Sequence, residues 1–367
     1  MKVISTGSKF DIYPDDLKSY DYLPPSYYVV RYSDKGGFWM EKYSEFAITD
    51  AKVYGIHYQK VDKVMNSFRL FERNLGVILS GDKGIGKSLF ARLLGKKAVS
   101  EGMPVIIIDK YVEDVDTFID QINQEVMLVF DEFDKTFAGK GRDEDPQVTM
   151  LSLFDGVSPG KKLFVITCND LHNLNGFMVN RPGRFHYHFR FDYPEASDVR
   201  EYLTDALKEE VKGEIEDVIA FSNRVGLNYD CLRAIAFELN QGLSFSEAIK
   251  DVNIVNVDKE AYRLKVVFED GSVYVNGKFF MDAFSEETME VQMHDKCGGY
   301  AGDVYFVPDK LRFDPGTGEL YADGDDVSMD YDTYDDESKE KREELRAKGL
   351  RRIIIRRLLN KRIHYDV

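Results

Sequence analysis

The fold of this chain is decided by the stretch Gly81-Asp82-Lys83-Gly84-Ile85-Gly86-Lys87-Ser88. It matches the pattern G-x-x-x-x-G-K-[ST], follows the apolar run 75–80 and opens a segment with helical periodicity, 88–99. Glycines in this arrangement let backbone N–H groups curl around a phosphate, and a helix N-terminus adds a favourable dipole. Lys87 would contact the β- and γ-phosphates, the Ser88 hydroxyl would ligate Mg²⁺, and Leu89 follows in the same helical turn. Glycine-rich turns also occur at ordinary strand–helix corners, but the Lys-Ser pair between a strand and a helix favours a site for ATP and Mg²⁺.

Apolar runs alternate with helical patterns around this loop. The runs are 75–80, 104–109, 126–131, 163–168 and 187–191. This alternation predicts an α/β fold with a parallel five-stranded sheet. Residues 195–251 show helical periodicity and no strand pattern. We therefore expect a large α/β subdomain over 61–192 and a helical subdomain over 193–251.

Two adjacent carboxylates, Asp131 and Glu132, end the third apolar run. In an open α/β sheet, ligands bind at the carboxyl ends of the strands, so both side chains are expected beside the phosphate-binding loop. Asp131 would hold Mg²⁺ or its water ligands, and Glu132 would polarise the attacking water. An Asp-Glu pair at a strand end is common by itself, but its place behind a phosphate-binding loop favours the functional interpretation.

Four segments between 61 and 250 resemble the AAA family of ATPases, in the family's order. They are Asp131-Glu132-Phe133-Asp134 (D-E-[IF]-D), Ser152-Leu153-Phe154-Asp155-Gly156 (L-x-x-L-D-G), the run 163–169 (ending in T-x-N) and Arg181-Pro182-Gly183-Arg184-Phe185 (R-P-G-R-[FVL]). The resemblance is to the AAA clade in the narrow sense, and within it to the branch that includes the mitochondrial Rieske-protein translocase. It implies an AAA module with a helical lid over 193–251. A compact motor with unfamiliar flanking segments would also suit a phage-encoded protein.

The resemblance implies a role for four further residues. Asn169 would be the sensor-1 residue that positions the attacking water with Glu132, although a strand-end cap is the simpler alternative. Arg181 and Arg184 would reach the γ-phosphate bound by a neighbouring subunit, or else be two surface arginines in a turn. Arg233 would be a nucleotide-contacting sensor-2 residue, but the preceding 226–229 departs from the family's G-[AS]-x-[AG] pattern.

The resemblance also implies pore loops, which the sequence supports unevenly. Lys110-Tyr111-Val112 is similar to an aromatic pore loop, yet a Tyr-Val pair also arises by chance. The polar segment 139–145 is either a second pore loop or a plain solvated turn.

Three segments flank this module. Residues 1–60 hold many tyrosines, with turn signals between short apolar runs, and predict a small β-rich N-terminal module. Residues 252–337 contain short β runs and the turn signals Asp270-Gly271 and Asn276-Gly277, which predict a second β module, followed by an acidic linker from 323. Residues 338–367 hold 11 Lys+Arg against four Asp+Glu. Their i, i+4 apolar spacing predicts a basic amphipathic helix, which docks on the acidic body, binds a partner or nucleic acid, or lies on an anionic membrane.

The composition bounds the class of protein. The chain has 367 residues, 43% hydrophobic residues and a net charge of −16, which favours a folded protein that repels a phosphate backbone in bulk. Cys168, Cys231 and Cys297 form no C-x-x-C pair, and no stretch has the pattern of a secretory signal or a membrane span. These features predict a cytoplasmic protein.

We therefore expect an ATP hydrolase that forms a homo-oligomeric ring, a hexamer, and remodels or translocates a macromolecular client, with a protein client favoured over nucleic acid. A DNA-linked motor or loader in replication or packaging is the first alternative, opposed by the acidic body and supported by the basic tail. A nucleotide-gated assembly scaffold is the second.

Overall fold

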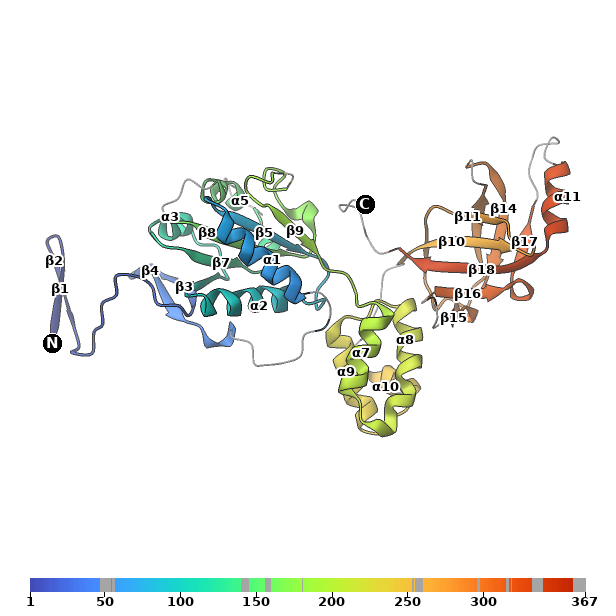
Figure 1. The fold of residues 1–367 in the computed structure, drawn as a ribbon, viewed down its shortest axis with the longest axis horizontal. Helices are drawn as coiled ribbons and strands as arrows, with labels where there is room; N and C mark the ends of the chain where they lie inside the picture. The colour runs from blue at the N-terminus through green and yellow to red at the C-terminus, as the bar shows by residue number, and fades with distance from the viewer. Residues whose placement is uncertain are drawn as a thin grey trace. The chain divides into compact units, whose positions relative to one another are not determined.

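The computed structural model describes residues 1–46, 54, 57–139, 145–155, 160–179, 181–252, 254, 260–295, 298–314, 317, 319–331 and 339–358. The chain divides into two compact units, Met1–Phe191 and Asp192–Val367 (Figure 1).

A seven-stranded sheet forms the centre of the first unit. Its strand order is β4 (Gly37–Lys42), β3 (Tyr27–Ser33), β6 (Val105–Ile108), β7 (Val126–Phe130), β8 (Lys162–Cys168), β5 (Leu75–Ser80), β9 (Tyr187–Arg190). The strands from β3 to β9 are parallel, and only β4 in this sheet is antiparallel to its neighbour. Every residue of β5, β6, β7 and β8 is buried, as expected for strands covered on both faces. The predicted parallel five-stranded sheet is confirmed, and two more strands extend it.

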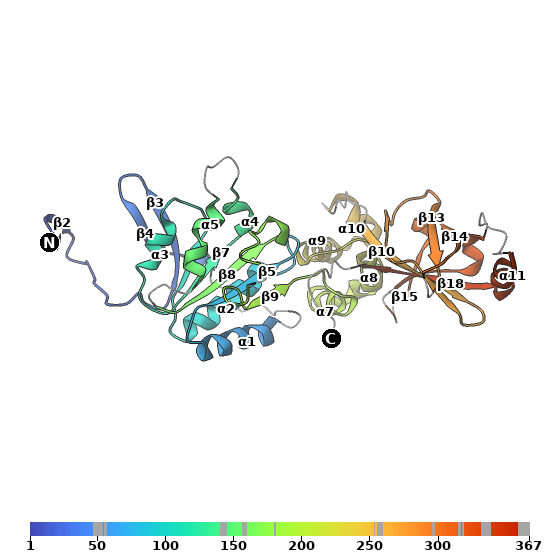
Figure 2. The ribbon, with the colours of Figure 1, turned by 90° about the horizontal axis from the view of Figure 1, so that it is seen from above.

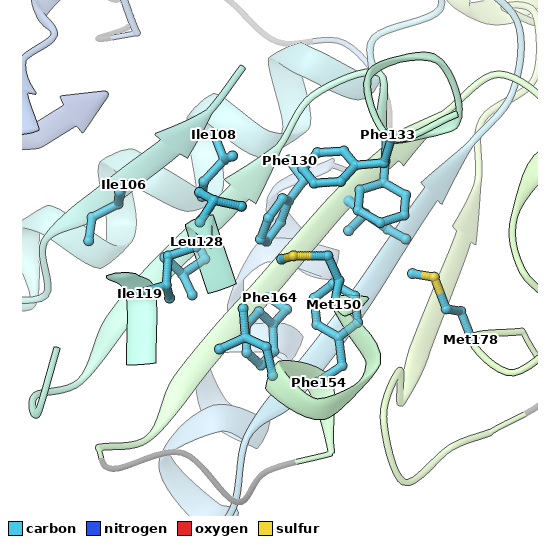
Figure 3. Packing of buried hydrophobic residues seen from close by; sticks show 14 of the residues in the cluster. Ile106, Ile108, Ile119, Leu128, Phe130, Phe133, Met150, Phe154, Phe164 and Met178 are labelled. Atoms are coloured by element: carbon cyan, nitrogen blue, oxygen red, sulfur yellow. The ribbon is translucent and has the colours of Figure 1, made fainter. Parts of the chain in front are cut away.

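Helices cover both faces of this sheet (Figure 2). On one face lie α1 (His57–Leu70) and α2 (Lys87–Ser100). On the other lie α3 (Val115–Asp120), α4 (Phe133–Thr136), α5 (Pro146–Thr149) and α6 (Leu151–Phe154). An apolar cluster fills the space between this second face and its helices. There Phe130 and Phe164 of the sheet pack with Phe133 and Phe154 of the helices and with Met150, which joins α5 to α6 (Figure 3).

The N-terminal residues do not form the separate β module predicted over 1–60. Among the described residues of this segment, only β1 (Lys2–Thr6) and β2 (Lys9–Tyr13) stand apart, as a two-stranded antiparallel sheet. β3 joins the main sheet by pairing in parallel with β6, because Tyr28 and Val29 are apolar enough to be buried there. Local periodicity identifies a strand but not its partner, and the partner of β3 is a strand of the main sheet.

The second unit begins with helices, as the periodicity of 195–251 predicted. They are α7 (Ala196–Ala206), the 3-10 helix η3 (Glu209–Glu214), α8 (Ile215–Arg224), α9 (Tyr229–Asn240) and α10 (Phe245–Asp251). Buried side chains such as Val199, Val218 and Leu232 form their common core. The Asn228 side chain caps α9 by accepting the Cys231 N–H, and Ser244 with Glu247 forms a capping box at α10.

A nine-stranded antiparallel sheet follows. It comprises β10 (Glu260–Phe268), β11 (Val273–Val275), β12 (Phe279–Met281), β13 (Met289–His294), β14 (Tyr300–Phe306), β15 (Arg312–Asp314), β16 (Glu319–Asp323), β17 (Ser328–Asp330) and β18 (Leu350–Arg357). The turn signal Asp270-Gly271 joins β10 to β11, with Gly271 at φ 80°. The acidic stretch from 323 to 331 is not a loose linker, because β17 and the end of β16 belong to the sheet; residues 332–338 lie outside the described part.

The predicted basic helical tail is also corrected. Residues Lys339–Lys348 form α11, but β18 lies inside the sheet between β10 and β16. Gly349, at φ 65°, ends the helix in a left-handed conformation that glycine adopts at little cost. Ile353 and Ile355 then point into the core, and a β-branched run of this kind favours a strand. Residues 359–367 of the tail lie outside the described part.

The arginines of β18 pair with acidic residues of the same unit. Arg352 lies 3.3 Å from Asp323, and Arg356 lies 2.7 Å from Glu319. One alternative predicted that the basic segment docks on the acidic body of the chain. It does so here as a strand, β18, within the sheet that carries those acidic residues. Among the described residues, no helix is both long and apolar enough to span a bilayer.

Candidate active site

The phosphate-binding loop joins β5 to α2. Gly81, at φ 136°, passes so close to the chain that a Cβ there would lie 2.2 Å from the Phe191 carbonyl oxygen, so no other residue fits. Gly86, at φ 101°, precedes the helix. The first helical hydrogen bond runs from the Phe90 N–H to the Gly86 carbonyl, which leaves the amides at the start of α2 without helical partners. These open N–H groups are the kind of donors that the predicted phosphate site requires.

Lys87 is the buried cation of this loop. Its side chain is buried, and Nζ donates to the carbonyl of Gly81, to the carbonyl of Asp82 at 2.6 Å and to Asn169 Oδ1 at 3.0 Å. Burial lowers the pKa of Lys87, and the nearby Asp82, Asp131 and Asp134 carboxylates oppose that shift. The three donors of the ammonium are thus held by protein oxygens that phosphate oxygens are able to replace.

Asp131 and Glu132 follow β7 and are tied to β8 by one hydroxyl. Thr167 Oγ1 donates to Asp131 Oδ1 at 2.7 Å and accepts the Glu132 N–H at 2.8 Å. Glu132 adopts φ 46°, a strained conformation for a residue with a side chain, and such strain concentrates at functional sites. Its carboxylate is half exposed and lies 2.9 Å from Lys135 Nζ. The sequence analysis gave no role to Thr167. The feature that could have identified it is its position in β8, two residues before Asn169.

The buried carboxylate of Asp134 positions Asn169. Asp134 is 6% exposed, and its Oδ2 accepts the N–H groups of Asn169 at 3.0 Å and Asp170 at 3.4 Å. The side chain of Asn169 in turn accepts a hydrogen bond from Lys87. The expected sensor residue therefore joins the phosphate-binding loop to the carboxylate strand. Asp134 was not among the expected site residues, although it is the last residue of the D-E-F-D segment.

The residues expected to hold Mg²⁺ suit that ion. Ser88 presents an exposed hydroxyl at the start of α2, and Asp131 is a partly exposed carboxylate. Both are hard oxygen donors, and Mg²⁺ is usually held by one or two protein oxygens together with phosphates and water. In the described part of the chain, no group of three or more His, Cys, Asp or Glu residues is arranged to bind a metal by itself.

The two arginines form a separate cluster. The N–H groups of Arg184 and Phe185 donate to the Arg181 carbonyl and close a turn. Arg184 is buried; its Nε and Nη2 donate to the carboxylate of Asp155, with Nη2–Oδ2 at 2.6 Å, and its Nη1 donates to the Phe177 carbonyl at 2.6 Å. These bonds lower the pKa of Asp155 and raise that of Arg184. Arg181 is exposed, with its guanidinium carbon 5.8 Å from the centre of the Phe177 ring.

Two other residues expected to have functional roles make contacts with neighbouring side chains instead. Arg233 lies on α9 in the second unit, where it is largely exposed and 3.4 Å from Asp230. Its contact with nucleotide stays a prediction. Tyr111 is half buried, and its ring packs edge-on against Phe137 with centroids 5.4 Å apart, which favours a packing role over a pore loop. Residues 140–144 of the second proposed pore loop lie outside the described part.

Comparison with known proteins agrees with this geometry. The model of the AAA family, the ATPase family associated with various cellular activities, matches residues 77–193. The proteasome-associated ATPase of Nakamurella multipartita is 26% identical over 236 residues, covering 55% of this chain and 39% of that protein. The one from Mycolicibacterium vanbaalenii is 23% identical over 235 residues, covering 55% and 38%. The ATPase family gene 2 protein of Saccharomyces cerevisiae is 24% identical over 144 residues, covering 35% and 18%. The chain thus spans less than half the length of these relatives, and the narrower branch and a phage origin stay predictions.

Proposed function

We propose that the chain is an ATP hydrolase with an AAA ATPase domain at residues 77–193, and that it assembles into a ring, a hexamer, that remodels or translocates a protein client. The observation that carries the ring is Arg181, an exposed cation on a turn held rigidly at Arg184. In AAA ATPases such arginines serve the active site of a neighbouring subunit. The protein client follows from relatives named proteasome-associated ATPase.

The site residues divide the hydrolysis of ATP among them. Amides at the start of α2 and the Lys87 ammonium bind and orient the phosphates. Ser88 and Asp131 would hold Mg²⁺, and the ion would supply charge neutralisation at the phosphate oxygens. The Glu132 carboxylate accepts a hydrogen bond from the attacking water and takes its proton, while Asn169 orients the same water. Thr167 and Asp134 fix the carboxylates and the asparagine in place, so that little reorganisation accompanies the reaction.

The structure weakens the case for a DNA-linked motor. The basic tail supported that alternative, and two of its arginines, at 352 and 356, are paired with Asp323 and Glu319 in the sheet. The net charge of −16 remains unfavourable for a phosphate backbone.

The test combines turnover with assembly. Glu132→Gln should keep ATP binding and lose hydrolysis by roughly 10²–10⁴-fold, because only proton transfer from water is removed. Sedimentation of this variant with ATP and Mg²⁺ should show a ring. The ATPase assignment fails if Glu132→Gln hydrolyses ATP at the wild-type rate, and the ring proposal fails if the ATP-bound variant sediments as a monomer at all concentrations.

A further inference from the structure

Arg184 is enclosed by contacts within its own subunit. Its guanidinium forms a two-pronged pair with Asp155 and a third hydrogen bond to the Phe177 carbonyl, and its side chain is 9% exposed. All three nitrogens of the guanidinium therefore donate to internal acceptors. For Arg184 to reach a neighbour's phosphate, it would have to give up these charge-assisted bonds and leave a carbonyl without its donor.

The backbone around Arg184 is anchored as firmly as its side chain. A Cβ on Gly76 would lie 2.3 Å from the Arg184 carbonyl oxygen, so the glycine lets the turn press directly against β5. The His186 N–H donates to the Gly76 carbonyl at 2.9 Å, and the ring of Phe185 packs edge-on against Phe154, with centroids 5.0 Å apart. The strand that leads into the phosphate-binding loop thus also fixes the arginine turn.

Arg181 differs from Arg184 in each of these respects. It begins the same turn, its side chain is exposed, and its contact with the exposed Phe177 ring is a cation–π contact at 5.8 Å. Such a contact on an exposed ring is weak and readily exchanged for a stronger anion. Arg181 is therefore a cation held at a fixed place but available to a partner.

We propose that Asp155 and Arg184 form a clamp that positions Arg181, and that Arg181 alone of the two arginines meets the γ-phosphate in the neighbouring subunit. The inference rests on the proposed ring. It assigns Asp155 a positioning role, and it moves Arg184 from direct contact with phosphate to the support of Arg181.

The experiment measures kcat, KM and mixed-ring activity for Arg181→Ala, Asp155→Asn, Arg184→Asp and the charge-swapped double variant Asp155→Arg with Arg184→Asp. Arg181→Ala should lose at least 100-fold in kcat with unchanged melting temperature, by comparison with arginine fingers in other enzymes, worth ~10³–10⁵. Asp155→Asn should lose about tenfold or more in kcat while KM for ATP is retained, because its own phosphate-binding loop is intact. Arg69→Ala, which removes a surface arginine paired with Glu101, is the control and should keep wild-type turnover.

Mixing locates the defect. Each of Arg181→Ala and Asp155→Asn should regain activity when co-assembled with Glu132→Gln, since the mixed ring then holds interfaces that join an intact active site to an intact Arg181 and clamp. A change that merely loosened the fold would not be rescued in this way. The charge-swapped double variant should recover at least tenfold over Arg184→Asp alone, because it restores the pair but cannot supply a cation from position 184.

Three outcomes overturn the proposal: wild-type turnover in Arg181→Ala, wild-type turnover in Asp155→Asn, or a charge-swapped variant that stays as inactive as Arg184→Asp. None of these resembles failure of the proposed function. That failure would show as a wild-type chain that stays monomeric with ATP, or as a Glu132→Gln variant that still hydrolyses it.

Discussion

The two large sheets of this chain differ in burial and in where their polar groups lie. The parallel sheet of the first unit is buried along β5, β7 and β8, and its polar groups gather where these strands end, at Ser80, Asp131 and Asn169. In the antiparallel sheet of the second unit, the buried Ile353 and Ile355 of β18 alternate with less buried residues, and its charges pair across neighbouring strands. The first arrangement concentrates chemistry at one edge, whereas the second spreads charge over a surface. Changes at the edge should therefore alter binding and catalysis, and changes in the second sheet should alter stability alone.

Lys87→Ala should give the largest effect. The contacts proposed between Lys87 and two phosphates would be charge-assisted, and their loss should weaken ATP binding on the order of 10³-fold, about 4 kcal/mol. Calorimetric titration with ATP and Mg²⁺ measures the change. Lys97→Ala, an exposed lysine near the end of the same helix, is the matched control and should bind ATP normally. If Lys87→Ala bound ATP with unchanged affinity, the loop 81–88 would not be the nucleotide-binding site.

Ile355→Ala should destabilise the second sheet without touching ATP binding. Ile355 is 1% exposed, and removing a buried branched side chain of this size costs about 2–5 kcal/mol. Hydrogen exchange should quicken in β10, β16 and β18. The single tryptophan, Trp39, lies on β4 of the first unit, so its fluorescence should report an unchanged transition there.

Ile354→Ala is the control for this change, because Ile354 is only half buried on the other face of the same strand. Its replacement should lower the free energy of unfolding less than Ile355→Ala does. If the two variants were equally stable, residues 350–357 would not form the strand described here, and the basic helix expected from the sequence would regain support.

Thr167→Val should have a smaller effect at the catalytic edge. It removes the hydroxyl that bonds both Asp131 and Glu132 but keeps the shape of the side chain. Leaving two partners unsatisfied should cost about 1–3 kcal/mol, seen as a fall in kcat of roughly tenfold or more. Thr204→Val removes an exposed hydroxyl bonded to the Arg200 carbonyl and should leave kcat unchanged. Equal turnover in the two variants would contradict the role given to Thr167.

The contrast between the sheets also explains what the sequence could predict. The phosphate-binding loop, the Asp131-Glu132 pair and the five parallel strands depend on residues at short, fixed spacings, and short spacings are visible in a single chain. The place of β18 depends on partners such as Asp323, which lies 29 residues before Arg352, and on β10, which lies further back still in the chain. The i, i+4 apolar spacing of the tail is equally compatible with a helix, and pairing with distant strands determines that the segment forms a strand.

The same reasoning applies to the arginine turn. The motif gave both arginines one role, because a motif records residue types and not their contacts. Asp155 lies 29 residues before Arg184, and nothing in the sequence links the two. The structure separates the arginines by burial, which is a property of the fold as a whole.

The smallest expected effect is the dependence of stability on pH through Asp155. The hydrogen bonds from Arg184 hold the pKa of Asp155 below its ordinary value of 3.8. A carboxyl whose pKa is lower in the folded state stabilises the fold above the unfolded pKa, and that contribution is lost as the pH falls through the folded pKa. The Asp155 side chain is 42% exposed, so solvent screening limits the contribution to about 1 kcal/mol or less.

Denaturant unfolding of wild type and Asp155→Asn should therefore differ by this amount at pH 7, and the difference should close only below pH 3.8. The two side chains have the same shape, and the asparagine of the variant is neutral at every pH. A difference that stays constant down to the acid range would therefore mean that the ion pair contributes nothing through its charge, and that the clamp holds by geometry alone.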